Sequence, residues 1–121
     1  MKVRKLIESF KYAISGITYT LETQRNMRIH FVAAICAICL GVFMNLTKTE
    51  LLVLFLTISL VIVTEMINTA IEKTIDMFTK EYHPLAKIAK NVAAGSVLIA
   101  AINAIIVAYL LFFSKISIRF Y

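Results

Sequence analysis

Carboxylate and amide side chains gather at one end of a long apolar segment. The segment from Leu51 to Val63 carries no charge, and the sequence TEMINTAIEKTID follows it directly. At 100° per residue on a helical wheel, the acids and the amide of this stretch lie within about 80° of one another. They are Glu65, Asn68, Glu72 and Asp76. Oxygen atoms of these types hold divalent cations or accept protons, so the stripe predicts metal binding or proton transfer.

A second polar cluster follows, in the sequence KEYHPLAKIAKNVAAGS. Pro84 can occupy the first turn of a helix, and that helix would carry Lys90 on one face with Lys87 and Asn91. Counted along the helices, Lys90 reaches nearly the depth of Glu72. Carboxylates that hold Mg²⁺ and a lysine that meets phosphate are the ingredients of phosphoryl transfer. The spacing alone therefore indicates a membrane enzyme or a transporter with an acidic cleft.

A conventional nucleotide-binding loop is excluded by the glycine content. The chain has 3 glycines, and neither GxxxxGK[ST] nor a glycine-rich kinase loop occurs in it. Any nucleotide site in this protein must therefore be unconventional.

The elements that carry these side chains are predicted to be membrane helices. Of the 121 residues, 60% are apolar, and the mean hydropathy is +0.85. These values are typical of integral membrane proteins and exclude a soluble globule. Three segments approach the roughly 20 residues that span a hydrocarbon core: 29–46, 51–71 and 92–113. The expected fold is an all-α membrane protein with a single domain, residues 1–121.

Residues 1–28 precede these spans and are predicted to form an amphipathic surface helix. Apolar residues recur there at spacings of three and four, and the basic residues mostly take the other face. The apolar positions are Leu6, Ile7, Phe10, Ile14, Ile17 and Leu21. Such a helix lies along the membrane surface, packs on another part of the protein, or does both.

Lysine and arginine are distributed unevenly around the spans. Six precede the first span and four lie between the second and third, whereas only Lys48, Lys115 and Arg119 lie on the opposite side. The positive-inside rule then predicts a cytoplasmic N-terminus and a cytoplasmic second connection. Attraction to anionic lipid headgroups accounts for the net charge of +6, so no nucleic-acid partner is expected.

The depth of the acidic residues in the membrane decides how their role is interpreted. If the second span enters the membrane near Glu50, Glu65 lies about 22 Å further along the helix and Glu72 about 33 Å. An ionised carboxylate at the depth of Glu65 is costly and must face the protein interior or a water-filled cleft. The alternative is that Glu65 only fixes the register of the helix by pairing with a cation or an amide.

The other polar residues of the spans are predicted to be structural. Cys36 and Cys39 lie inside the first span with no second pair or nearby histidine to complete a zinc site, so free thiols are expected. His30 is interpreted as an interfacial side chain rather than a ligand. Asn103, in the middle of the third span, could hydrogen-bond across helices and aid assembly.

Several motifs of the chain match one family. The segment EMINTAIEKTID fits the pattern E-x-x-N-[ST]-A-I-E-x-x-x-D, and EYHPLAKIAKNVAAG follows where the family has A-K-D-x-A-A-x-A-V. With SFKYAISGI and RNMRIH, the chain resembles the small prokaryotic diacylglycerol kinases over nearly its whole length. The similarity is greatest to the branch of Gram-positive bacteria that phosphorylates undecaprenol.

The resemblance implies a homotrimer of three-span subunits in the bacterial plasma (inner) membrane, with shared active sites at the cytoplasmic face. It implies ATP as co-substrate, Mg²⁺, and undecaprenol as substrate, with diacylglycerol as the alternative. By the match, Glu65 is the general base, Asn68 orients the site, and Asp76 supports it. The expected magnesium ligands are Glu72 and Gln24. The expected nucleotide-binding residues are Tyr12, Gln24, Glu72, Glu81, His83, Lys90 and Asn91.

Two positions depart from the family pattern. Gln24 stands where the family has a glutamate that helps to hold magnesium, and Asn91 replaces the aspartate of A-K-D. Amide oxygens still bind Mg²⁺, but two negative charges are lost, which weakens metal affinity. A weaker kinase, a rearranged metal site and a non-catalytic protein that binds lipid or nucleotide are the resulting alternatives. A small channel or transporter subunit that uses the Glu65 stripe is a further one.

Overall fold

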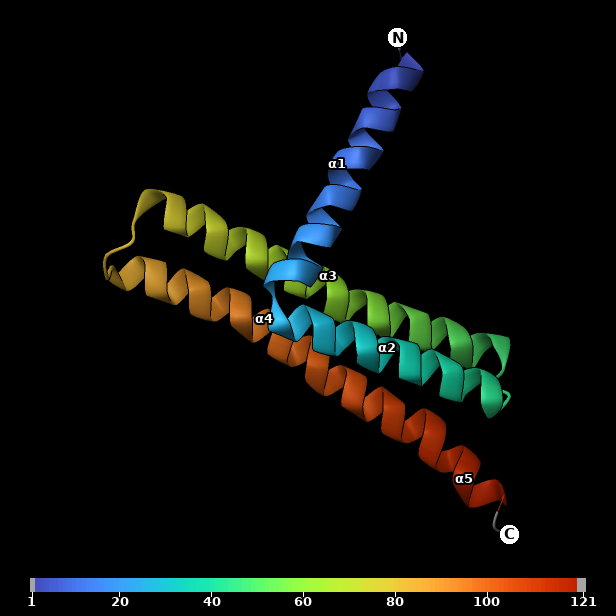
Figure 1. Ribbon diagram of the computed structural model, residues 1–121. Coiled ribbons are helices and arrows are strands. Elements are labelled where there is room, and N and C mark those ends of the chain that lie inside the picture. The colour runs from blue at the N-terminus through green and yellow to red at the C-terminus, as the bar shows by residue number, and fades with distance from the viewer. Residues whose placement is uncertain (1, 120–121) are drawn as a thin grey trace.

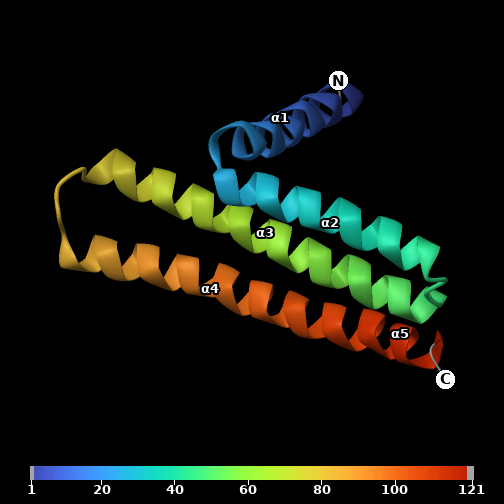
Figure 2. The ribbon, with the colours of Figure 1, turned by 60° about the horizontal axis from the view of Figure 1, so that its bottom comes forward.

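The computed structural model describes residues 2–119, and this part of the chain is built from helices without a strand. The elements are α1 (Lys2–Thr23), α2 (Arg25–Phe43), α3 (Lys48–Phe78), α4 (Pro84–Ala108), the π-helical turn η1 (Tyr109–Phe113) and α5 (Ser114–Arg119). Helix α3 packs against both α4 and α2, and α1 projects away from these three (Figures 1 and 2). The predicted all-α fold is confirmed.

Three helices are long and apolar enough to cross a membrane, as the sequence predicts. They cover Arg25–Phe43, Lys48–Phe78 and Pro84–Ser117. Helix α2, the first of these three, ends at Phe43. The expected span reaches residue 46, but the chain turns after Phe43 toward the start of α3. Pro84 is the first residue of α4, which confirms its predicted place in the first helical turn.

The turn between α2 and α3 is fixed by hydrogen bonds at both helix ends. Asn45 adopts a positive φ of 56°, and the Leu46 N–H donates to the Gly41 carbonyl at 3.1 Å. This is the Schellman ending of a helix, for which asparagine is a common left-handed residue. Thr47 and Glu50 then form a reciprocal capping box at the start of α3. The two membrane helices are thereby joined without a flexible loop.

Replacing Thr47 by alanine is expected to lower the free energy of unfolding by about 1 kcal/mol, because the Glu50 backbone N–H loses its cap. Reversible unfolding in mixed micelles with increasing denaturing detergent would measure this change. Thr49→Ala is the matched control, because Thr49 is exposed in the same helical turn. Equal shifts for both variants would contradict the assigned cap.

One face of α3 is buried against its neighbours over most of its length. The buried positions are Leu54, Thr57, Val61, Glu65, Asn68 and Thr69. Apart from the adjacent pair Asn68 and Thr69, they follow one another at spacings of three and four residues, which places them in a single stripe. The first half of this stripe is mostly apolar. The buried stripe continues into the acidic residues, so the helix packing itself points Glu65 and Asn68 into the protein.

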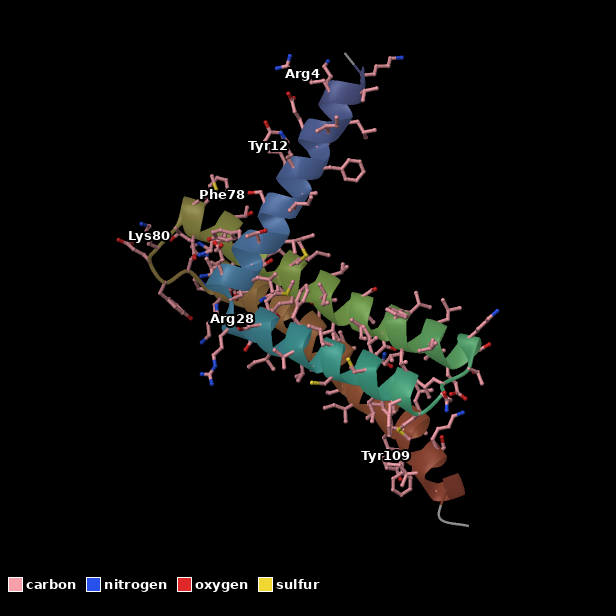
Figure 3. All side chains as sticks on the ribbon, turned by 45° about the vertical axis from the view of Figure 1, so that its right-hand side comes forward. Arg4, Tyr12, Arg28, Phe78, Lys80 and Tyr109 are labelled. Atoms are coloured by element: carbon pink, nitrogen blue, oxygen red, sulfur yellow. The ribbon has the colours of Figure 1, made fainter. Side chains whose placement is uncertain are left out.

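Helix α1 is attached to the bundle only near its C-terminal end. There the Arg28 guanidinium donates to the Leu21 and Glu22 carbonyls at 3.1 and 2.9 Å, and so satisfies backbone groups that the ending helix leaves free. Figure 3 shows Arg28 at the junction of α1 and α2. Thr20 and Met27 are buried beside this junction. The bend therefore holds α1 at a steep angle to the membrane helices.

Most of the apolar face predicted for α1 is left uncovered by the described residues. Leu6, Ile7, Phe10, Ile14 and Ile17 are all exposed on it. An uncovered apolar face with basic residues opposite is typical of a helix at a membrane surface.

Candidate active site

The centre of the candidate site is the Glu65 carboxylate on α3. Glu65 is 3% exposed, and its Oε2 lies 3.8 Å from Nε2 of His30 on α2. A carboxylate so enclosed in a membrane helix is a functional-site candidate, because its burial is costly without a partner or a use.

Asn68 and Glu72 continue the site along α3. The Asn68 side-chain amide donates to Glu72 Oε1 at 3.4 Å. The Asn68 Oδ1 atom is buried, and none of the described residues donates a hydrogen bond to it. A buried carbonyl oxygen without a partner is rare in folded proteins and indicates a place for a ligand atom.

The residues present fit Mg²⁺ in part. Within residues 2–119 no group of three His, Cys, Asp or Glu side chains gathers into a metal cage. Mg²⁺ is commonly held by one or two protein carboxylates together with substrate phosphates and water. The Glu72 carboxylate beside the unpaired Asn68 Oδ1 satisfies that smaller requirement.

Lys90 lies on α4 and forms an ion pair with Asp76 on α3. The Nζ–Oδ1 distance is 2.7 Å, and both side chains are nearly half-exposed. The sequence predicts that acid and base meet near the inner end of these helices, and they do so through Asp76. Asp76, which the resemblance gives a supporting role, therefore holds the lysine in place beside the acidic stripe.

A polar cleft of about 280 Å³ lies where α3 connects to α4. Its lining includes four of the residues expected to bind nucleotide: Glu81, His83, Lys90 and Asn91. Lys80 and Lys87 also line it, so three ammonium groups surround one cleft. Figure 3 shows Lys80 at this connection, at the end of the bundle far from Tyr109. The charge and the position suit a polyanionic ligand that arrives from water.

The local structure of the connection fixes one of these side chains. His83 is the residue before α4, and its Nδ1 accepts a hydrogen bond from the Leu85 backbone N–H at 3.2 Å. The histidine therefore caps the helix, and its other ring nitrogen is the one that remains for a ligand.

Tyr12 and Gln24 lie apart from these groups in a single chain. Tyr12 is 76% exposed, on the part of α1 that projects from the bundle (Figure 3). Gln24 lies in the bend between α1 and α2, where its amide donates to Thr23 Oγ1 at 3.2 Å. The structure gathers the other site residues at α3 and the start of α4 and does not bring these two to them.

An apolar groove of about 340 Å³ runs between α2, α3 and α4. Alanines from α2 and α4 form much of its wall, and His30 lies in its lining. The groove therefore leads to the histidine that faces Glu65. A buried carboxylate next to a residue that lines an apolar groove, with a cationic cleft further along, suits a substrate with a hydrocarbon tail and a polar head.

His30 is the site residue that the sequence reasoning missed. The sequence predicts an interfacial side chain at this position, and the structure places its Nε2 atom 3.8 Å from Oε2 of Glu65. Apart from the two cysteines it is the one ionisable residue in the segment 29–46, and a buried acid needs a partner. Together these two facts could have indicated from the sequence that His30 is the partner of Glu65.

Comparison with known proteins places these features in one family. The profile of the family "Prokaryotic diacylglycerol kinase" matches residues 11–112. A protein of Bacillus subtilis named undecaprenol kinase is 37% identical over 115 residues, which cover 95% of this chain and 94% of that protein. A diacylglycerol kinase of Escherichia coli is 28% identical over 102 residues, 84% of each chain.

A diacylglycerol kinase of Synechocystis is 46% identical over 103 residues. That match covers 84% of this chain and 59% of the cyanobacterial protein, so part of the relative has no counterpart here. The Bacillus protein, in contrast, matches this chain nearly from end to end. The resemblance drawn from the sequence motifs is thus confirmed, and the chain belongs to the prokaryotic diacylglycerol kinase family.

Proposed function

We propose that this protein transfers the γ-phosphoryl group of ATP to the hydroxyl of a membrane lipid alcohol, with undecaprenol as the main substrate. Diacylglycerol is the alternative substrate. The observation that carries the proposal is the Glu65 carboxylate, which is buried within a membrane helix beside His30, a residue that lines an apolar groove. The nearly full-length match to a protein named undecaprenol kinase supports the choice of alcohol.

Glu65 acts as the general base in this reaction. As the hydroxyl oxygen forms its bond to the γ-phosphorus, Glu65 takes the hydroxyl proton. The bond from that phosphorus to the oxygen of the β-phosphate breaks, and ADP leaves with that oxygen. Asn68 orients the reacting groups beside Glu65. The depth of Glu65 suits an alcohol whose tail stays in lipid while the phosphate comes from water.

The polar cleft between α3 and α4 binds the nucleotide. Lys90 approaches the phosphates while it keeps its contact with Asp76, because an ammonium group has three hydrogens to donate. Glu81, His83 and Asn91 provide the other contacts within the chain. Tyr12 completes the site from α1, and its distance from the bundle is consistent with an active site shared between subunits.

Magnesium is proposed to bind at Glu72 and Gln24, with the unpaired Asn68 Oδ1 as a further oxygen. When bound, the ion neutralises charge on the phosphate oxygens. Gln24 is turned toward Thr23 in the free chain, so it must change its side-chain conformation to take this role.

The working assembly is proposed to be a homotrimer in the bacterial plasma membrane, with the N-terminus and the active site on the cytoplasmic side. Asn103 supports an assembly, because this amide is exposed in the middle of the apolar helix α4. A polar group facing hydrocarbon is costly and finds hydrogen-bond partners when helices of another subunit approach. The distribution of basic residues supports the orientation.

Transfer of label from [γ-³²P]ATP to lipid in mixed micelles tests the proposal. The purified protein is expected to phosphorylate both alcohols in the presence of magnesium, with a higher kcat/KM for undecaprenol than for diacylglycerol. A higher value for diacylglycerol would overturn the substrate assignment. Absence of labelled lipid with either alcohol would overturn the kinase assignment.

Restoring the two carboxylates of the family pattern is expected to strengthen the metal site. The double variant Gln24→Glu with Asn91→Asp should reach half-maximal rate at a magnesium concentration about tenfold lower, because anionic oxygens bind Mg²⁺ more tightly than amides do. Magnesium titrations at fixed ATP would measure the shift. An unchanged requirement would show that other groups already provide the charge.

A further inference from the structure

His30 is placed where it can act on the base of the proposed reaction. Its side chain is 20% exposed and that of Glu65 is 4% exposed, with 3.8 Å between Nε2 and Oε2. Within residues 2–119, His30 is the one side chain that forms an ion pair with this carboxylate. The two residues come from different helices, so the pair is made by the tertiary packing of α2 on α3.

In the part of the chain that the structure describes, no second cation forms an ion pair with Glu65. Helix α4 packs on the same region of α3 and has no ionisable residue between Val92 and Ala108. Glu72, the next acid on α3, carries the same charge as Glu65. A buried carboxylate without hydrogen bonds is strongly disfavoured. His30 is therefore the group on which the position of this carboxylate depends.

The chemistry of the His30–Glu65 pair suits a histidine that positions the carboxylate. An imidazole with its hydrogen on Nε2 donates to a carboxylate oxygen in both its neutral and its charged form. The 3.8 Å separation is longer than a direct hydrogen bond, and catalytic hydrogen bonds are often long in the free enzyme and shorten with substrate. One oxygen of Glu65 would then be held by the histidine, which leaves the other for the substrate hydroxyl.

The groove links this pair to the substrate. His30 lines the apolar groove between α2, α3 and α4 and faces Glu65 at the same time. A lipid alcohol whose tail occupies the groove brings its hydroxyl to the place where the histidine and the carboxylate meet.

We propose that His30 is a positioning residue, which holds the Glu65 carboxylate through Nε2 so that its free oxygen faces the hydroxyl of the lipid alcohol. The inference rests on the proposed function and adds a residue of α2 to its machinery. A purely structural role, in which the pair only fixes helix register, would affect folding and leave turnover of the folded protein unchanged.

Comparison of His30→Gln with His30→Leu in the full-length protein tests this role. The amide nitrogen of glutamine can take the place of Nε2, whereas leucine fills similar space without a donor. In the lipid phosphorylation assay, His30→Leu is expected to lower kcat about 100-fold, the scale of a misplaced catalytic group. The KM for ATP should stay within about twofold, since the cleft that binds nucleotide is separate. His30→Gln should recover kcat to within about fivefold of the wild type.

Two further variants distinguish a loss of catalysis from misfolding. Thr64→Val is the matched control, because Thr64 lies beside Glu65 on α3 and its hydroxyl bonds to carbonyls of its own helix. If His30→Leu does not fold, His30→Asn replaces it, since the asparagine amide is too short to reach the place of Nε2.

The outcomes separate this inference from the proposed function. Normal kcat in folded His30→Leu, or equal losses in the glutamine and the leucine or asparagine variants, would overturn the positioning role while the lipid kinase stands. Absence of labelled lipid with the wild-type protein would overturn the kinase and the positioning role together.

Discussion

Glu65→Gln is expected to reduce phosphorylation of the lipid alcohol by about 10²–10⁴-fold in kcat, the range that a lost general base costs. The amide keeps the size of the side chain and an oxygen that faces His30, but it cannot take the hydroxyl proton. Because Glu65 does not line the cleft that is proposed to bind nucleotide, ATP affinity should change little.

Initial rates at saturating ATP, together with ATP binding to the same preparation, would measure this effect. Glu8→Gln provides the same chemical change on exposed α1, where Glu8 only pairs with Arg4 at 3.5 Å. That control should keep its activity. A Glu65→Gln protein with normal turnover would remove Glu65 from the role of base.

The second large effect is expected for Glu72→Gln. The amide can still accept the hydrogen bond from Asn68 that the carboxylate accepts at 3.4 Å, so the local structure should persist. What is lost is the negative charge next to the unpaired Asn68 Oδ1. The magnesium concentration for half-maximal rate should rise about tenfold or more, because hard cations prefer anionic oxygens.

Magnesium titrations of the wild type and the variant would measure that shift, and high magnesium should restore part of the rate. Partial rescue distinguishes a weakened metal site from misfolding. An unchanged magnesium dependence would contradict the assignment of Glu72 as a metal ligand.

The stripe on α3 could be predicted from sequence because it depends only on helical spacing. Glu65 and Asn68 are buried on one face of the helix, and Glu72 is partly buried, as the wheel places them. Local chemistry also predicts the start of α4 at Pro84, since proline is favoured in the first turn of a helix. These features need no knowledge of which helix lies next to which.

The contacts between helices could not be predicted in the same way. The partners of Glu65 and Lys90 depend on the packing of α2 and α4 against α3, and sequence spacing on one helix says nothing about the rotation of its neighbour. The sequence predicts an interfacial side chain for His30 and does not predict its proximity to Glu65. It predicts that Lys90 lies at nearly the depth of Glu72, but not that Asp76 is the acid with which it pairs. The direction of α1 depends likewise on the Arg28 contacts at the bend.

The most direct test of the central claim is the stoichiometry of the reaction of the wild-type protein. ADP and chloroform-extractable lipid phosphate would be counted in the same sample, with undecaprenol and with an analogue that lacks the hydroxyl. Transfer to the alcohol predicts one lipid phosphate for each ADP, and little ADP with the analogue. ADP release that continues without the hydroxyl, or no lipid phosphate with undecaprenol, would contradict the proposed kinase reaction.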